Sequence, residues 1–501
     1  MEKLRELAKL VTPNKTKSIT VIGNGKDAGT KLDHLYRLLA SGEVSTDEEA
    51  FRALYPDATR KNAYYKLKHE LRNRLYNSVF FLDAKKSRGT DRQDAFVRCQ
   101  FLIALGAFLQ VGRAWTNVAS VTRTAYELAT KYELTNEAIS TVRRLMLLNR
   151  TRGDRKRVDA YTLELLELSR LQEKELLAEV YWTQINKAFV EENSYKQSLP
   201  VRAANYAEML DNIPIARESL KLIYLDAAIR AAAAMTAHDY AGAVPILEAA
   251  LDRIVNYERF QDRVYTYTIA VNLLACHISL KQHPEARRVL RLLEENVVAG
   301  TYNWFKVKEL HFTLSLHTQR YAEAAMVHRA VSNHPDLKRQ PAVLRESWTV
   351  YSAYLQMLYN ADLISEEQSV AKRRFRIARF VNELPIYARD KRGHNITVLV
   401  AQIVLLLQQG KFDALIDRFE AINKYRERYV SRETNFRGNV FLHMLREVTR
   451  NDFNRPAVLA ATADLRAKLD EEPIDILSPG YDQEILPYED LWEVLLRGLP
   501  E

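Results

Sequence analysis

A short corner that recurs along the chain constrains its fold more than any other feature of the sequence. At each copy, a small polar turn is followed by a bulky, often aromatic residue that opens a new helical segment. The clearest copies are Asn193-Ser194-Tyr195, His238-Asp239-Tyr240, Gln319-Arg320-Tyr321, Gly410-Lys411-Phe412 and Asn451-Asp452-Phe453. Self-similarity at a fixed period of about 40 residues in a helical sequence is typical of stacked helical hairpins. We therefore predict an all-α solenoid.

Weaker copies extend the repeat toward the N-terminus and fill the gaps between the clear copies. The bulky positions then form a register of Trp115, Arg155, Tyr195, Tyr240, His283, Tyr321, Leu363, Phe412 and Phe453, with an average step of about 42 residues. In the better copies a small residue follows three places later, at Ala243, Ala286 and Ala324. That offset places it on the same helix face as the bulky residue, so we expect the paired helices to approach closely there.

The corner resembles that of tetratricopeptide-repeat (TPR) proteins, in which a Gly-x-aromatic-x-x-Ala stretch opens the second helix of each hairpin. His238-Asp239-Tyr240-Ala241-Gly242-Ala243 and Gln319-Arg320-Tyr321-Ala322-Glu323-Ala324 match it best, and the resemblance covers roughly residues 95–470. It implies a right-handed TPR-like α-solenoid, with units longer than the family's usual length of about 34 residues. It also implies that the first helix of each hairpin lines a groove for a protein or peptide. The expected groove residues are Tyr224, Arg230, Tyr267, Asn272 and His311.

Composition agrees with long helices joined by short turns, because the 501 residues include only 15 glycines and 14 prolines. The two cysteines, Cys99 and Cys276, lie in apolar helical patterns and predict buried thiols in a reducing compartment. The longest apolar run, Ile396 to Leu407, is shorter than the roughly 20 residues that cross a bilayer. We expect a cytoplasmic protein without a membrane-spanning segment.

Residues 1–90 do not fit the repeat and form a separate N-terminal module in our interpretation. Three helices are expected near residues 30–41, 46–54 and 58–82, the second capped by Ser45 or Thr46. We place the solenoid at residues 91–472 and an acidic C-terminal capping segment at 473–501; residues 470–501 hold ten Asp/Glu against one Arg. The net charge of +9 is therefore unevenly distributed.

The basic helix of the N-terminal module carries a stripe of cationic and tyrosine side chains. Its members are Lys61, Tyr65, Lys68, Arg72 and Tyr76. Such a stripe could contact phosphates and sugars, and a three-helix module could place residues 58–82 in the DNA major groove. Two other interpretations stay open: a solvated helix face, and a surface for an acidic partner or for the chain's own acidic tail.

Motifs for catalysis, nucleotides and metals do not stand out. The order Gly29-Thr30-Lys31 inverts the Gly-Lys-Ser/Thr of a phosphate-binding loop. Histidine pairs such as His277/His283 are six residues apart, whereas zinc ligands on one helix are separated by about four. We therefore predict a non-catalytic protein-binding scaffold without cofactor or metal, which could form homo-oligomers. The alternative is a nucleic-acid-binding regulator with a helix-turn-helix-like N-terminal module and a solenoid as its sensor or oligomerisation domain.

Overall fold

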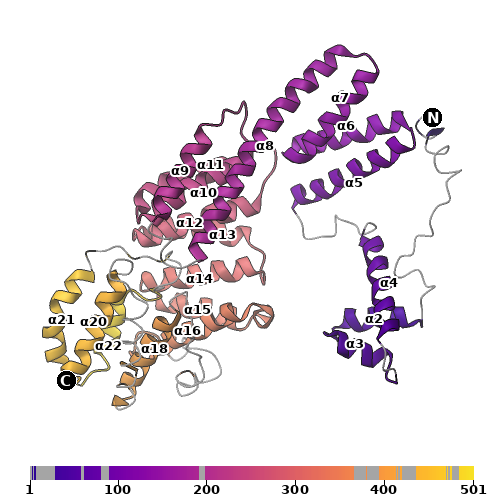
Figure 1. Ribbon diagram of the computed structural model, residues 1–501. Coiled ribbons are helices and arrows are strands. Elements are labelled where there is room, and N and C mark those ends of the chain that lie inside the picture. The colour runs from indigo at the N-terminus through magenta and orange to yellow at the C-terminus, as the bar shows by residue number, and fades with distance from the viewer. Residues whose placement is uncertain are drawn as a thin grey trace. The chain divides into compact units, whose positions relative to one another are not determined.

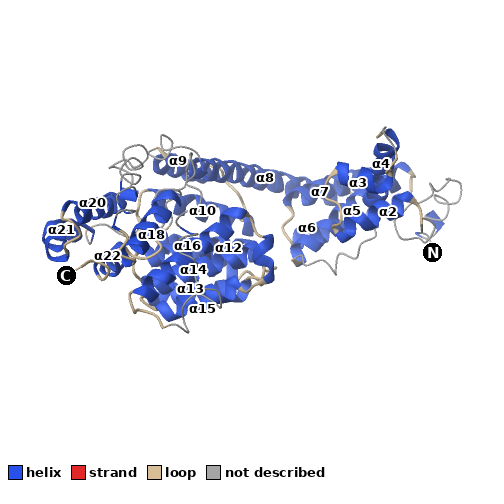
Figure 2. Cartoon of the chain, turned by 90° about the horizontal axis from the view of Figure 1, so that it is seen from below, coloured by secondary structure: helices blue, strands red, loops and turns tan. Residues whose placement is uncertain are grey.

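The chain folds entirely into helices over the residues that its computed structural model describes (Figures 1 and 2). Those residues are 3, 5–6, 29–57, 61–79, 90–190, 198–365, 380, 394–412, 415, 418–419, 436–469, 471, 474, 476 and 484–500. The expected all-α class is confirmed for them. The chain divides into two compact units, Met1–Leu168 and Ser169–Glu501, which are described separately below.

The N-terminal part of the first unit contains the three helices expected there: α2 (Lys31–Ser41), α3 (Asp47–Leu54) and α4 (Asn62–Val79). Thr30 caps α2, and Thr46 and Glu49 form a reciprocal capping box at α3. A small core holds the three helices together, with Leu35, Phe51, Tyr64 and Leu71 among its buried members. The sequence signals for the starts of α2 and α3 were therefore correct, whereas α4 begins at Asn62 and not at the expected residue 58.

The rest of the first unit is a series of helices, α5 (Asp91–Val111), α6 (Trp115–Lys131), α7 (Thr135–Thr151) and the beginning of α8 (Arg155–Val190), up to Leu168. The helix α6 packs on both α5 and α7. Its N-terminal cap, Ala114, has no side-chain acceptor. The Glu6 carboxylate supplies one from elsewhere in the chain, accepting from the backbone N–H groups of Thr116 at 3.2 Å and Asn117 at 3.1 Å.

The second unit continues with helices that pack in sequence order from α9 to α16, as Figure 1 shows. Their bounds are α9 Leu199–Asp211, α10 Leu220–Thr236, α11 Tyr240–Val255, α12 Arg263–Ser279, α13 His283–Asn296, α14 Tyr302–His317, α15 Tyr321–Ser332 and α16 Ala342–Asn360. After the short 3-10 helix Pro335–Arg339 and α16 come α18 His394–Gln408, α20 Phe436–Arg450, α21 Arg455–Leu469 and α22 Tyr488–Leu496. The apolar run that was judged too short for a membrane lies in α18, and its residues 397–407 are buried.

The recurring corner is a Schellman motif, in which a left-handed residue ends one helix. At most copies the next helix begins two residues later. Seven of these left-handed residues are not glycine: Arg113, Glu133, His238, Lys281, Gln319, Asp362 and Asp452, with φ between 48° and 60°. The residue that follows donates its backbone N–H to the carbonyl five positions earlier, at 2.8–3.1 Å. These bonds run from Ala114, Leu134, Asp154, Asp239, Gln282, Arg320, Leu363, Lys411 and Phe453.

The predicted register is confirmed at most of its described positions. Trp115, Arg155, Tyr240, His283 and Tyr321 are each the first residue of a helix. The small residues Ala243, Ala286 and Ala324 are completely buried, as expected from their place beside the corner. Phe412 directly follows a corner residue as well.

Four details of the register were wrong or lie outside the described residues. Leu363 and Phe453 are the residues that close the Schellman motif, so they precede the next helix instead of opening it. Glu133 forms a further corner, because α6 and α7 are also joined by this motif. The helix α8 runs for 36 residues without the turn that a hairpin would need, and Tyr195 is not among the described residues.

The C-terminal segment 484–500 packs onto helices of the second unit. The helix α22 contacts α18 and α21, and Trp492 is fully buried. Arg437 in α20 binds Glu484 at 2.6 Å and Glu489 at 2.7 Å, and all three side chains are largely buried. Removing one member of such a group leaves a buried charge without its partner, which destabilises the fold. Buried ion pairs therefore hold this segment in place together with apolar packing.

The left-handed corner predicts opposite effects of substitution at glycine and non-glycine positions. Gly410 has φ +68°, and a Cβ there would meet no atom within 4 Å, so Gly410→Ala adds only backbone strain of about 1 kcal/mol. Lys281→Gly at φ 56° removes such strain and is expected to stabilise the second unit slightly. Urea unfolding followed by circular dichroism measures both effects. Equal shifts in the same direction would contradict the assignment of strain to these corners.

Candidate partner-binding surface

Three helices of the second unit form a layer in which alternate members of the series touch. Besides packing on their sequence neighbours, α10 contacts α12, and α12 contacts α14. All five residues predicted for the groove lie on these helices: Tyr224 and Arg230 on α10, Tyr267 and Asn272 on α12, and His311 on α14. Each of them is partly buried, as expected for side chains at the edge of a helix-helix contact.

Tyrosines link the helices of this layer. The rings of Tyr224 and Tyr265 stack across the α10–α12 contact, with centroids 4.7 Å apart and planes 13° from parallel. Burial raises the pKa of Tyr224, and it raises the pKa of Tyr267 to about 12, with smaller effects from Tyr302 and Glu309. Tyr302, at the start of α14, is 52% exposed and was missed by the sequence analysis.

Arg230 is held by two carboxylates. Its Nε lies 2.8 Å from Asp226, one turn earlier in α10, and its Nη2 lies 2.6 Å from Asp211 in α9. The hydrogen bond to Asp226 is the main reason why its pKa is raised. The guanidinium is therefore fixed in direction at the α9–α10 contact. Asn272 shares α12 with Tyr267 and is half-buried.

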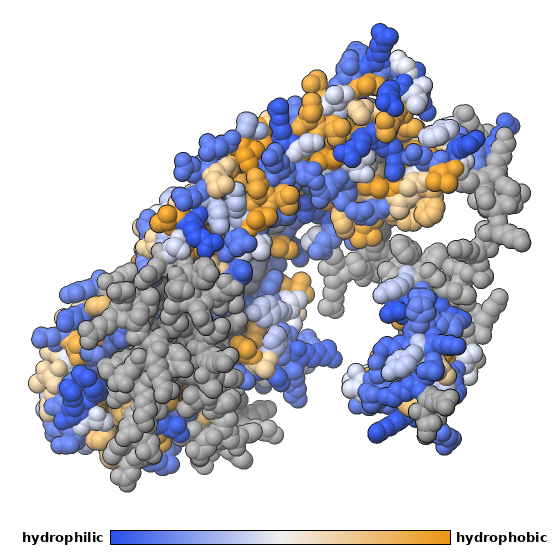
Figure 3. Space-filling model, in the orientation of Figure 1, coloured by the Kyte–Doolittle hydropathy of each residue, from blue (hydrophilic) through white to orange (hydrophobic). Residues whose placement is uncertain are grey.

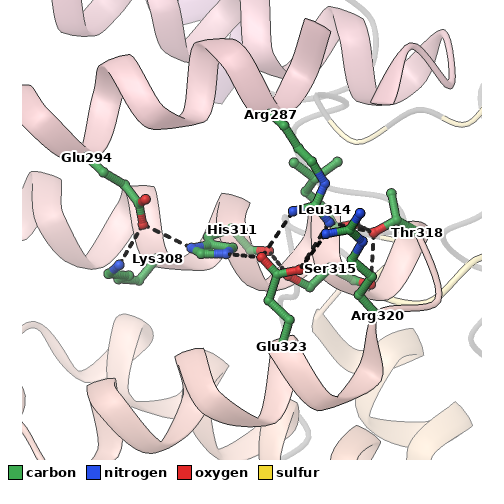
Figure 4. Close-up of polar contacts among 9 residues, drawn as sticks. All are labelled: Arg287, Glu294, Lys308, His311, Leu314, Ser315, Thr318, Arg320 and Glu323. Atoms are coloured by element: carbon green, nitrogen blue, oxygen red, sulfur yellow. Dashed lines mark hydrogen bonds and ion pairs between the residues drawn. The ribbon is translucent and has the colours of Figure 1, made fainter. Parts of the chain in front are cut away.

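His311 lies at the centre of a charged network between consecutive hairpins (Figure 4). Its Nδ1 is 2.9 Å from Oε1 of Glu294 in α13, and its Nε2 is 2.9 Å from Oε1 of Glu323 in α15. A carboxylate only accepts hydrogen bonds, so the doubly protonated ring is the form that donates to both partners. His311 thus connects the second helices of two neighbouring hairpins.

Cations complete the network on both sides of the imidazole. Lys308 contacts Glu294 at 2.6 Å, and Arg287 binds both oxygens of Glu323, at 3.0 and 3.1 Å. Hydrogen bonds from His311 and Lys308 lower the pKa of Glu294 to about 2. Burial acts against the ionised form of Glu323, but the bonds from Arg287 and His311 outweigh it and lower its pKa too. The network joins α13, α14 and α15 through compensated charges.

Among the described residues, no group of three or more His, Cys, Asp or Glu could hold a metal ion. Both cysteines are buried, and burial raises the pKa of Cys99 to about 11 and of Cys276 to about 12. A thiol with a raised pKa is a poor nucleophile. These side chains therefore act in packing.

The predicted nucleic-acid stripe lies on α4 and, for Lys61, on the residue just before it, but two of its cations are already paired within the module. Lys61 contacts Glu48 at 2.6 Å, and Lys68 contacts Asp47 at 2.5 Å. The two tyrosines point outward, with Tyr65 50% and Tyr76 62% exposed. Arg72 lies between them in sequence and approaches the His69 ring at 2.9 Å. Exposed ion pairs contribute only about 0–1 kcal/mol, so phosphates could replace the two carboxylates.

Comparisons with protein-family models, with curated proteins and with solved structures found no match to this chain. Function is therefore inferred from the residues and their geometry alone.

The pKa of Glu294 leads to a prediction about stability and pH. Its pKa is lowered from 4.5 to about 2 in the folded chain, so its stabilising contribution is complete above about pH 4.5 and is lost as the pH falls toward 2. Because the side chain is 30% exposed, we expect Glu294→Gln to cost about 2 kcal/mol at pH 7. Chemical unfolding between pH 7 and 3 should show the difference shrinking.

The control for this prediction is Glu295→Gln, which changes the same charge at the exposed neighbouring position. It should unfold as the wild type does at every pH. A loss of stability that is constant between pH 7 and 3 would show that Glu294 acts through packing alone.

The stripe on α4 leads to a second prediction. If it binds nucleic acid, the combined change Lys61→Gln, Lys68→Gln and Arg72→Gln should abolish retention on a DNA or RNA column at low salt. It should also reduce the slope of log K against log salt by about 0.9 for each lost phosphate contact. Lys66→Gln, an exposed change on the same helix, is the matched control. A wild-type protein that passes through the column at 20–50 mM salt, roughly the range in which phosphate contacts are strongest, excludes this function.

Proposed function

We propose that this chain is a non-catalytic, cytoplasmic protein-binding scaffold, built as a right-handed TPR-like solenoid, whose second unit binds a peptide or protein segment. The support for a TPR-like arrangement is the hairpin order of α10 to α15, with a Schellman corner inside each hairpin and longer connections between hairpins. The contacts from α10 to α12 and from α12 to α14 also support it, because they put the first helices of successive hairpins in one layer.

The observation that carries the binding proposal is the kind of side chain on this layer. Protein interfaces are enriched in tyrosine and arginine, which offer a large contact area together with a polar group. The layer presents Tyr302 at 52% exposure beside the half-buried Tyr267, with Arg230 and His311 held in place by their ion pairs. Side chains that are already fixed lose little conformational entropy when a partner binds.

A nucleic-acid-binding regulator is the second proposal, and the exposed Tyr65 and Tyr76 on α4 favour it. Stacking of a base on an exposed tyrosine does not depend on the paired lysines. The two proposals concern different parts of the chain and are tested independently.

The scaffold proposal predicts that one exposed side chain of the layer matters more than an equally exposed one outside it. We expect Tyr302→Ala to reduce capture of the partner at least tenfold in affinity purification of the tagged full-length protein from its native cells. Met326→Ala on α15, where the side chain is 69% exposed, should leave capture unchanged. Truncating an interface tyrosine costs more than about 1.4 kcal/mol when it is a dominant contact.

Quantitative mass spectrometry of the captured proteins measures this difference, and circular dichroism confirms that both variants fold. Equal recovery of every captured protein by the two variants would place the binding surface elsewhere on the chain.

A further inference from the structure

The helix α5 exposes an apolar stripe to solvent. Its members are Val97 (55% exposed), Phe101 (55%), Phe108 (76%) and Val111 (85%), with the exposed Ala104 at the centre. The spacings between them are four, three, four and three residues, which is the a/d repeat of a coiled-coil seam. Figure 3 shows hydrophobic side chains gathered over this helix.

The opposite face of α5 is apolar as well and packs against α6. Ala95, Cys99, Gly106 and Leu109 are buried on the side that packs against α6. A helix that is apolar on all sides is normally buried on all sides. By length and composition α5 could even cross a membrane, a property that the sequence analysis overlooked. A single helix of this kind is weak evidence for a membrane span. Only one face of α5 is exposed and the opposite face packs on protein, which fits a contact with another helix better than a membrane.

We propose that the stripe on α5 is the contact surface for a second copy of this chain, paired antiparallel about a two-fold axis. Antiparallel seams place a positions opposite d positions. With the axis between Ala104 and Phe108, Ala104 faces Phe108 of the second copy, and Phe101 faces Val111. Every such layer pairs one large side chain with one smaller side chain, as close packing requires.

Parallel pairing is disfavoured by the same side chains. It would set Phe101 against Phe101 and Phe108 against Phe108, with the narrow pair of Ala104 residues between them. Wide and narrow layers would then alternate along one seam, and the two helices could not keep a constant distance. Antiparallel pairing also aligns the helix dipoles favourably. The seam itself carries no charged residue that would have to be desolvated.

The area available matches what a specific dimer needs. An aromatic side chain buries about 150–250 Å², so the exposed parts of Phe101 and Phe108, with those of the smaller residues, amount to roughly 500–600 Å² per copy. The pair would bury about 1,000–1,200 Å², at the lower limit for a specific interface. We therefore expect a dimer that dissociates on dilution.

Sedimentation velocity of the full-length protein over a hundredfold concentration range tests this proposal. The wild type should shift from monomer to dimer, and Phe108→Glu should weaken dimerisation at least a hundredfold. Leu163→Glu in α8, where the side chain is 65% exposed, introduces the same charge on the same unit away from the stripe. It should dimerise as the wild type does.

The orientation is tested with spin labels on Gln93→Cys, near the start of α5. Both native cysteines are buried, so the introduced thiol reacts selectively. Antiparallel pairing should separate the two labels by about 30 Å or more, because a helix rises about 1.5 Å per residue. Parallel pairing would place them within roughly 15 Å.

Three results would overturn the proposal. The first is a wild type that stays monomeric at every concentration. The second is a dimer that Phe108→Glu leaves intact. The third is a monomer that floats with phospholipid vesicles and loses that binding in Phe108→Glu, which would show that the stripe contacts lipid instead of a second copy.

Discussion

The hydrogen bond that closes each Schellman corner is the interaction on which the helical series depends. It joins the N–H after a left-handed residue to the carbonyl five positions earlier and ends a helix within one residue. The next helix then begins two residues after the left-handed one, at Trp115, Tyr240, His283 and Tyr321. With so short a connection, consecutive helices have few ways to pack. The apolar faces of the two helices therefore meet in a fixed register.

The corner also explains the small residues that follow it. The backbone N–H groups of Ala243, Ala286 and Ala324 donate to the carbonyls of the residues that close the motif, at 3.0–3.1 Å. These alanines are completely buried, because they face the preceding helix across a three-residue turn. A larger side chain would force the two helices apart. The combination of a bulky and a small residue is thus one structural requirement, which is why a single sequence revealed the register.

Features set by local chemistry were predicted well, and features set by distant neighbours were not. The caps at Thr30 and Thr46 depend on residues within one turn, so the sequence contains all the information they need. The unbroken α8 could not be foreseen, because helix continuation depends on packing along its whole length. The corner at Glu133 was missed because it lacks both glycine and a following aromatic residue.

In the candidate site, too, the partners that come from distant parts of the sequence were not predicted. The resemblance to TPR proteins led us to expect Tyr224, Tyr267 and His311 on the first helices of hairpins, but it gave no indication of their partners. The carboxylates that hold His311 come from α13 and α15, and those that pair with Lys61 and Lys68 come from α3. Such pairs join residues 12 to 21 positions apart in sequence, which the packing of the helices brings together. A stripe of basic residues therefore says little about free charge until its neighbours are known.

The helices α22 and α5 differ in how much apolar surface they expose. At the C-terminal end, α22 lies on α18 and α21 and buries Trp492 completely. At α5, the first helix before the Schellman corners of the series, two phenylalanines and two valines remain exposed in a coiled-coil repeat. Terminal repeats of a solenoid require a polar or covered outer face for solubility. Since α5 is apolar on that face, its sequence is better explained by a partner helix than by solvent.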